Sequence, residues 1–110
     1  MAGKSLFLKM FGDSPLLRVL DFFMVYEDFD YSMVDIARNS GVGYSTLKLF
    51  WSDLTKYRIV VQTRNVGKAK LFKLNSKEPV VQKFKALYWV AIKKETEKLL
   101  KPKIKVLIRT

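Results

Sequence analysis

The stretch MVDIARNSGVGYSTLKLFWSDLTKY, residues 33–57, decides the fold, and it divides into two amphipathic segments around a short turn. Ser32 is a good N-cap for a first helix over about 33–39, because its hydroxyl can accept a hydrogen bond from a backbone N–H of the first turn. Gly41 stands where that helix must end and the chain must turn at low steric cost. Val42 is apolar within a polar turn, so we expect it to fill the space between two helices.

A second helix is predicted over about 44–57, directly after Gly43. Apolar residues three and four positions apart form its buried face, which consists of Leu47, Phe50, Trp51 and Leu54. The other side carries Tyr44, Ser45, Lys48, Leu49 and Ser52. Two short helices joined by such a turn form a helix-turn-helix, whose second helix can enter the major groove of DNA. Similar helix pairs also occur in folds that bind nothing, so the motif alone leaves both interpretations open.

The net charge of +11 is unevenly distributed along the chain. Residues 58–110 hold 15 of the 21 basic side chains and only three of the 10 acidic ones, so residues 1–57 are close to neutral. This asymmetry indicates a polyanionic partner, with nucleic acid first and an anionic membrane surface second. A lysine-rich solvated surface would explain the same charge without a partner.

The length and composition of the chain exclude several classes of protein. The length suits one domain, and we expect a single domain over residues 1–110. No apolar run is long enough to span a membrane, and the first residues do not form a signal peptide. The chain has no cysteine and no histidine, which removes disulfides, the commonest general base and the commonest metal ligand. We therefore expect a cytoplasmic, nucleoid-associated protein that is not an enzyme and uses no cofactor, metal or membrane.

Two helices are predicted before the central stretch. Residues 5–11 form a short apolar segment, and the Asp-Ser-Pro sequence at 13–15 is a capping signal with proline in the first turn. The next helix runs over about 15–26 and is apolar on more than one side, which favours a central core position. Its polar residues Arg18 and Asp21 are three positions apart, and we expect them to pair on its exposed side.

The pattern after residue 57 changes from helical to extended. The β-branched run 59–63 and the partly alternating run 69–74 are predicted strands, joined by a turn over 64–68. The hairpin tip is basic and carries Arg64, Asn65 and Lys68, with Lys70 just behind. A hairpin in this position forms a wing that can contact phosphates or the minor groove, although a basic tip can also serve solubility alone. We expect the acidic loop over 27–31 to face away from DNA.

The last helix is predicted from Pro79 to about Leu100. Its apolar surface is wide for so small a domain, so we expect it to pair with a second copy. The candidate dimerisation residues are Phe84, Leu87, Tyr88, Ala91 and Ile92. The alternative is that the helix folds back over the N-terminal helix. Residues 101–110 contain a proline that discourages helix, and we expect a basic tail there, either a strand or a loose segment.

Residues 36–84 resemble the winged helix-turn-helix domain of small archaeal transcriptional regulators, which are relatives of the MarR- and ArsR-type families. The shared features are the IA…GV…ST helix pair, the L…IV segment before the wing, the VGKAKLFKLN hairpin and a final helix that starts with proline. The resemblance implies an α+β, mostly helical winged helix-turn-helix with a two-stranded wing and a long C-terminal helix. Gly43 replaces the usual Ser or Thr cap and Tyr44 stands where arginine is frequent, so no base preference is implied. Metal sensing, known for some ArsR-type proteins, has no support in a chain without cysteine and histidine.

Our leading hypothesis is sequence-specific binding of double-stranded DNA by a homodimeric transcriptional regulator. Helix 44–57 would enter the major groove, and hairpin 59–74 would lie on the flanking backbone. The candidate DNA-binding residues are Tyr44, Ser45, Thr46, Lys48, Leu49, Ser52, Lys56, Arg58, Arg64, Asn65, Lys68 and Lys70. Two alternatives remain: an architectural or plasmid-partition protein that spreads along DNA, and a winged-helix module that binds other proteins, which the apolar Leu49 would suit.

Overall fold

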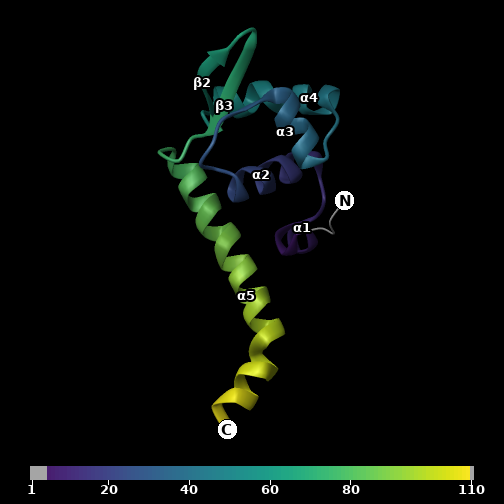
Figure 1. The fold of residues 1–110 in the computed structure, drawn as a ribbon, viewed down its shortest axis with the longest axis vertical. Helices are drawn as coiled ribbons and strands as arrows, with labels where there is room; N and C mark the ends of the chain where they lie inside the picture. The colour runs from purple at the N-terminus through teal and green to yellow at the C-terminus, as the bar shows by residue number, and fades with distance from the viewer. Residues whose placement is uncertain (1–4, 110) are drawn as a thin grey trace.

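A computed structural model describes the backbone of residues 5–109 and the side chains of residues 5–98. In this part of the chain the elements are α1 (Leu6–Phe11), α2 (Pro15–Val25), β1 (Tyr31–Ser32), α3 (Met33–Ser40), α4 (Tyr44–Lys56), β2 (Val60–Val66), β3 (Ala69–Leu74) and α5 (Pro79–Arg109). Figure 1 shows α2, α3, α4 and the hairpin of β2 and β3 gathered at one end of the molecule, with α1 below α2, while α5 extends away from them. The long helix accounts for the elongated shape, which measures 60 × 29 × 23 Å.

Helices α3 and α4 form the predicted helix-turn-helix. The hydroxyl of Ser32 accepts a 3.2 Å hydrogen bond from the backbone N–H of Asp35, as expected of an N-cap. Gly41 ends α3 with a φ of 71°, in the left-handed region that favours glycine. Val42 is buried between the helices, as predicted. Val34, by contrast, is exposed, because the inner side of α3 is formed by the residues two and three positions further on.

The inner face of α4 has the predicted composition. Leu47, Trp51 and Leu54 are buried, and Phe50 is partly buried against the same core. The ring of Trp51 meets the ring of Phe72 in β3 edge to face, with centroids 5.0 Å apart. This contact fixes the second helix of the motif against the sheet, so helix and wing share one core.

The three strands form an antiparallel sheet in the order β1-β3-β2. Strand β1 has only two residues, which is too short for a sequence pattern to reveal, and it pairs with β3 through Tyr31↔Phe72 and Ser32↔Leu71. The fold is therefore an α+β, mostly helical winged helix-turn-helix with a long C-terminal helix. The two-stranded wing that the sequence predicts has a third strand at its base.

The N-terminal helices begin as predicted, but the expected pair between Arg18 and Asp21 does not form. Arg18 instead binds the carboxylate of Asp13 and donates to the carbonyl of Gly41 at 2.9 Å. Asp21 accepts hydrogen bonds from partners on other helices, described below. Spacing on one helix was a poor guide here, because α2 is enclosed by neighbours that supply closer partners.

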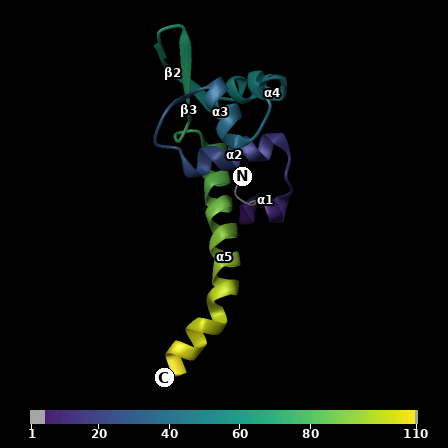
Figure 2. The ribbon, with the colours of Figure 1, turned by 45° about the vertical axis from the view of Figure 1, so that its right-hand side comes forward.

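Helix α5 differs from its predicted course in two ways. Figures 1 and 2 show it passing α1, and its residues Tyr88 and Ala91 are buried within the chain. Phe7 of α1 packs on Tyr88 with ring centroids 4.9 Å apart, so the first half of α5 does pack on the N-terminal helix. The helix also continues to Arg109 rather than ending near Leu100. A proline removes only one backbone donor and bends a helix without always ending it, and Figure 2 shows α5 bending in its last part.

Candidate nucleic-acid interface

The outer face of α4 is exposed and mostly polar, and most of its predicted residues lie in the first two turns of the helix. The predicted residues Tyr44, Ser45, Lys48, Leu49 and Ser52 are all exposed, and Leu49 has 81% of its surface accessible. Thr46 is only partly exposed, because it lies between the outer and the inner face. Gly43 precedes α4 in an extended conformation, and no side chain caps the first turn. The backbone N–H groups of that turn therefore point outward without a side-chain acceptor.

Lys48 is held beside the first turn of α4. Its Nζ lies 5.5 Å from the ring centroid of Tyr44, which is one helical turn earlier. A cation over an aromatic face gains electrostatic stabilisation and loses some of its rotational freedom. The ammonium is thus directed along the outer face of α4 rather than away from it. Lys56 lies in the same way 5.3 Å from the ring centroid of Tyr57 at the other end of the helix.

Arg58 ends α4 in a left-handed conformation with a φ of 59°. Its backbone N–H donates to Thr55 at 3.1 Å, and the next N–H, of Ile59, donates to Leu54 at 2.9 Å. This pair of hydrogen bonds is a Schellman motif, which usually has glycine at the left-handed position. The side-chain amide of Asn75 donates a 2.9 Å hydrogen bond to the backbone carbonyl of Arg58, which also stabilises the turn. The exposed Arg58 side chain therefore projects from a fixed backbone between α4 and the wing.

The hairpin tip is shorter than the sequence suggested. Strand β2 continues to Val66, so Arg64 and Asn65 belong to the strand and not to the tip. The turn consists of Gly67, with a φ of 60°, and Lys68. Asn65 lies opposite Lys70 in the register of β2 and β3, so these two side chains are neighbours near the tip. Lys68 is the basic residue that extends furthest along the wing.

Arg64 is paired with a carboxylate. Its Nε and Nη2 donate to Oδ2 and Oδ1 of Asp30 at 2.9 and 3.2 Å. The guanidinium lowers the pKa of Asp30 to about 2, with the hydroxyl of Thr63 adding to the effect. The acidic loop before β1, expected to face away from DNA, thus contacts the wing through Asp30. Among the candidate cations, this contact distinguishes Arg64 from Lys48, Lys56, Arg58, Lys68 and Lys70, for which no ion pair is described within residues 5–98.

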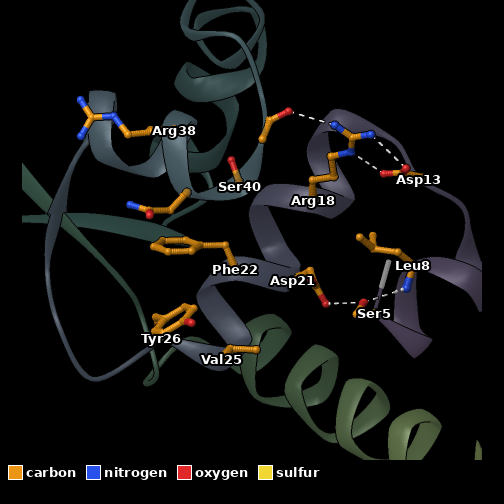
Figure 3. A pocket seen from close by; sticks show the side chains of 12 residues that line it. Ser5, Leu8, Asp13, Arg18, Asp21, Phe22, Val25, Tyr26, Arg38 and Ser40 are labelled. Carbon is orange, nitrogen blue, oxygen red and sulfur yellow. Dashed lines mark hydrogen bonds and ion pairs between the residues drawn. The ribbon is translucent and has the colours of Figure 1, made fainter. Parts of the chain in front are cut away.

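A cavity of about 290 Å³ lies behind the helix-turn-helix, between α1, α2 and α3. Figure 3 shows Arg18 on one side of it and Asp21 on the other, each directed to a different partner. Arg18 joins Asp13 to the carbonyl of Gly41, and so ties the start of α2 to the turn before α4. The hydroxyl of Ser40 donates to the carbonyl of Ile36 at 2.6 Å. Arg18 therefore helps to hold the helix pair in place, whereas Asp21 accepts a hydrogen bond from Ser5, which precedes α1.

Sequence analysis missed two residues that shape this interface, Arg18 and Asp30. Local spacing is the only signal in the sequence, and it predicts a pair with Asp21 for Arg18 and a loop facing away from DNA for Asp30. Both form contacts across more than 20 residues of chain, with Gly41 and Arg64 respectively. Such pairs depend on how distant segments meet and have no signature in a single sequence.

Within the described residues, no group of three or more acidic side chains is arranged to hold a metal ion. None of the helices there combines the length and the apolar character needed to cross a membrane.

No protein-family model matches the sequence, and no curated protein does. Solved structures do match. ZitR from Lactococcus lactis, as the C30AH42A mutant in apo form, superposes with a TM-score of 0.63 at 13% identity, and the match covers 93% of this chain and 82% of that one. ZitR bound to DNA matches with a TM-score of 0.54 at 14% identity, over 74% of this chain and 57% of that one.

Two further structures carry family names. A MarR-family transcriptional regulator from Silicibacter pomeroyi has a TM-score of 0.59 at 14% identity, with 84% of this chain and 61% of that chain covered. The homodimeric winged helix-turn-helix DNA-binding domain of Mb0332 from Mycobacterium bovis, a candidate ArsR-family regulator, has a TM-score of 0.56 at 19% identity, with 89% and 95% covered. The chain thus has the winged-helix fold of MarR- and ArsR-family transcription regulators. These named sources are bacteria, and they give no support to the archaeal part of the resemblance.

Proposed function

We propose that this protein is a transcriptional regulator that binds double-stranded DNA as a homodimer. The observation that carries the proposal is the exposed outer face of α4, where Lys48, Tyr44 and an uncapped first turn lie together. The start of α4 offers backbone N–H groups and a partial positive charge to a phosphate. Lys48, further along the same face, is within the part of the helix that would meet base edges, where guanine O6 and N7 accept hydrogen bonds.

The flanking contacts are electrostatic. Lys56 and Arg58 at the end of α4, and Lys68 and Lys70 on the wing, would neutralise phosphates on either side of the groove. Each neutralised phosphate releases counterions, so the logarithm of the binding constant should fall with the logarithm of salt concentration by about 0.9 per phosphate. Ser45, Thr46, Leu49, Ser52 and Asn65 would complete the contact surface as polar or apolar neighbours.

The homodimer would form through an open groove between α1 and α5. Its apolar lining consists of Met10, Phe11, Leu87, Val90 and Ala91, and its rim carries Lys94, Glu95, Glu97 and Lys98. Leu87 is 48% exposed, and the rim carries two lysines and two glutamates, so an identical surface can offer opposite charges to it. Of the residues predicted for dimerisation, Leu87 lies in this groove with an exposed side chain. Tyr88 is buried in the chain's own core, and Phe84 and Ile92 pack against that core.

Matched substitutions separate dimerisation from DNA binding. Leu49→Glu and Leu87→Glu make the same chemical change at two exposed leucines, one on α4 and one on α5. We expect Leu87→Glu to yield monomers in sedimentation equilibrium, and Leu49→Glu to remain dimeric but lose DNA binding. Dimers in both variants would contradict the assignment of the groove.

The DNA test is a fluorescence-anisotropy titration at several salt concentrations. Duplexes from the upstream region of the protein's own gene would be compared with scrambled duplexes of equal composition. We expect preference for the upstream DNA in the wild type, loss of binding in Lys48→Ala, and little change in the control Lys83→Ala, an exposed lysine on α5. No binding by the wild type at moderate salt would refute the proposal. Equal, cooperative coating of all duplexes would favour an architectural or plasmid-partition role instead.

A further inference from the structure

Three side chains from two distant segments meet at the base of the wing. Asp30, at the end of the loop after α2, accepts two hydrogen bonds from Arg64 and one of 2.5 Å from the hydroxyl of Thr63. The same hydroxyl lies 3.3 Å from the carbonyl of Leu71, but it has one proton, and a carboxylate is the stronger acceptor. A single carboxylate thus binds two consecutive residues of β2.

This arrangement depends on a β-bulge. Gln62 pairs with Phe72 and Arg64 with Leu71, which leaves Thr63 as an extra residue in β2. In a regular strand, successive side chains point to opposite faces of the sheet, so Thr63 and Arg64 could not share an acceptor. The bulge brings both to the same side, and it also bends the strand that contains it. Whatever fixes the bulge therefore fixes the direction of the hairpin beyond it.

Asp30 is anchored to the body of the protein. It is followed directly by β1, which pairs with β3 at the base of the sheet. Glu27 in the same loop forms an ion pair of 2.5 Å with Lys85 of α5. The hairpin beyond the bulge has fewer attachments, because residues 62–70 are all exposed. The contact between Asp30 and the bulge is thus the side-chain link from the body of the protein to the outer part of the wing.

We propose that Asp30 is a positioning residue for DNA binding, which holds the bulge of β2 so that the wing tip with Lys68 meets the DNA backbone. In this role Arg64 acts through Asp30 and not on a phosphate of its own. The inference rests on the proposed DNA-binding function. Under this proposal Arg64 is no longer a phosphate contact, because the carboxylate of Asp30 balances the charge of its guanidinium.

A double-mutant cycle on DNA affinity tests this role. Asp30→Asn and Arg64→Met should each weaken binding about threefold to fivefold, and the double variant should bind no worse than either single variant. The double variant removes one charge of each sign, so its salt dependence should equal that of the wild type. If Arg64 contacts a phosphate directly, Arg64→Met will reduce DNA affinity by the same factor in the Asp30→Asn variant as in the wild type. The slope of the logarithm of the binding constant against the logarithm of salt concentration will then fall in magnitude by about 0.9. That result would overturn the proposal.

Asp28→Asn is the matched control, because Asp28 lies exposed in the same loop and makes no hydrogen bond or ion pair in the described part of the chain. Hydrogen exchange of the DNA-free protein gives a second readout. Asp30→Asn should speed exchange of the amides between Thr63 and Leu71, and Asp28→Asn should not. Unchanged exchange in Asp30→Asn would refute the positioning role. If the wild type binds no DNA, the proposed function fails, while the exchange experiment still decides whether Asp30 holds the wing.

Discussion

The hydroxyl of Tyr88 donates a hydrogen bond of 2.7 Å to Oδ1 of Asp21, which lies 67 residues earlier in the chain. The same oxygen accepts from the hydroxyl of Ser5 at 2.8 Å, so one carboxylate joins α1, α2 and α5. Burial raises the pKa of Tyr88 above its usual range, and the hydrogen bond to Asp21 adds to the effect. The raised pKa favours the protonated hydroxyl, which is the form that donates to Asp21.

Replacing Tyr88 by phenylalanine should lower the free energy of unfolding by about 1–3 kcal/mol, because the carboxylate of Asp21 loses a donor in a partly buried position. Urea denaturation measures the change, and the protein concentration is kept fixed because the stability of the proposed dimer would depend on it. Tyr57→Phe is the control, because Tyr57 is 63% exposed. If both variants lose the same free energy of unfolding, the hydrogen bond between Tyr88 and Asp21 does not contribute specifically to stability.

Arg58→Gly should stabilise the protein while weakening its binding to DNA. The left-handed backbone at Arg58 costs a non-glycine residue about 1–2 kcal/mol. Glycine relieves that cost but has more freedom in the unfolded chain, so we expect a net gain of about 0.5–1 kcal/mol. Thermal denaturation and DNA titration on the same sample would separate the two effects. A less stable Arg58→Gly variant would mean that the arginine side chain stabilises the turn.

The pKa of Asp30 has a consequence for the acid stability of the wing. Because the folded-state pKa is about 2, below the ordinary value of 3.8, the ionised carboxylate stabilises the fold above about pH 4. This contribution should be lost as the pH falls from about 4 to 2. A carbon-detected NMR titration of the Asp30 carboxyl group would measure its pKa directly. In the Arg64→Met variant that pKa should rise toward 3.8, and an unchanged value would contradict the ion pair as its main cause.

Lys68→Ala should reduce the salt dependence of DNA binding more than Arg64→Met does. Lys68 lies in the two-residue turn at the end of the wing and has no ion pair among the described side chains, so its charge is available to a phosphate. Losing one phosphate contact should lower, by about 0.9, the magnitude of the slope of the logarithm of the binding constant against the logarithm of salt concentration. Lys83→Ala provides a control for the loss of one positive charge far from the wing. A slope that falls equally in both lysine variants would indicate a general charge effect.

Gly43→Asp should reduce DNA affinity without unfolding the protein. Gly43 has a φ of −62°, and a Cβ there would meet only Thr46 Oγ1 at 3.8 Å, so a side chain fits. Aspartate is a good N-cap, and it should raise stability by a few tenths of a kcal/mol, about the usual difference between glycine and a capping residue. Its charge would then occupy the position proposed for a phosphate. Gly43→Asn caps equally well without the charge, and equal affinity of the two variants in DNA titration would contradict phosphate binding at this helix start.

Local signals in the sequence predicted most of the fold. The N-cap at Ser32, the turn at Gly41 and the spacing of Leu47, Trp51 and Leu54 are determined by residues within a few positions of one another. Such short-range preferences and apolar periodicity can be identified in a single sequence. They located the helix pair, the hairpin and the start of the last helix.

The corrections concern features that depend on distant residues. Arg64, a candidate DNA contact, pairs with Asp30 in the loop before β1, which lies 34 residues away in the chain. Strand β1 exists because β3 offers it a partner, and Tyr88 is buried because α1 happens to lie beside it. The roles of the candidate residues on α4 and the wing stay predictions, because their exposure shows only that they are accessible.

If α4 binds DNA as proposed, its uncapped start would couple the folding of its first turn to DNA binding. Gly43 has no side chain to accept a hydrogen bond from the N–H groups that follow it, so the first turn of α4 lacks the stabilisation that a capping residue supplies. If a phosphate supplies the missing acceptor, DNA completes a hydrogen-bonding arrangement that the polypeptide leaves open. A bound site should then slow amide exchange in that turn as well as raise overall stability. The helix would reach its full order only on its target, and weakly matched DNA would leave its first turn frayed.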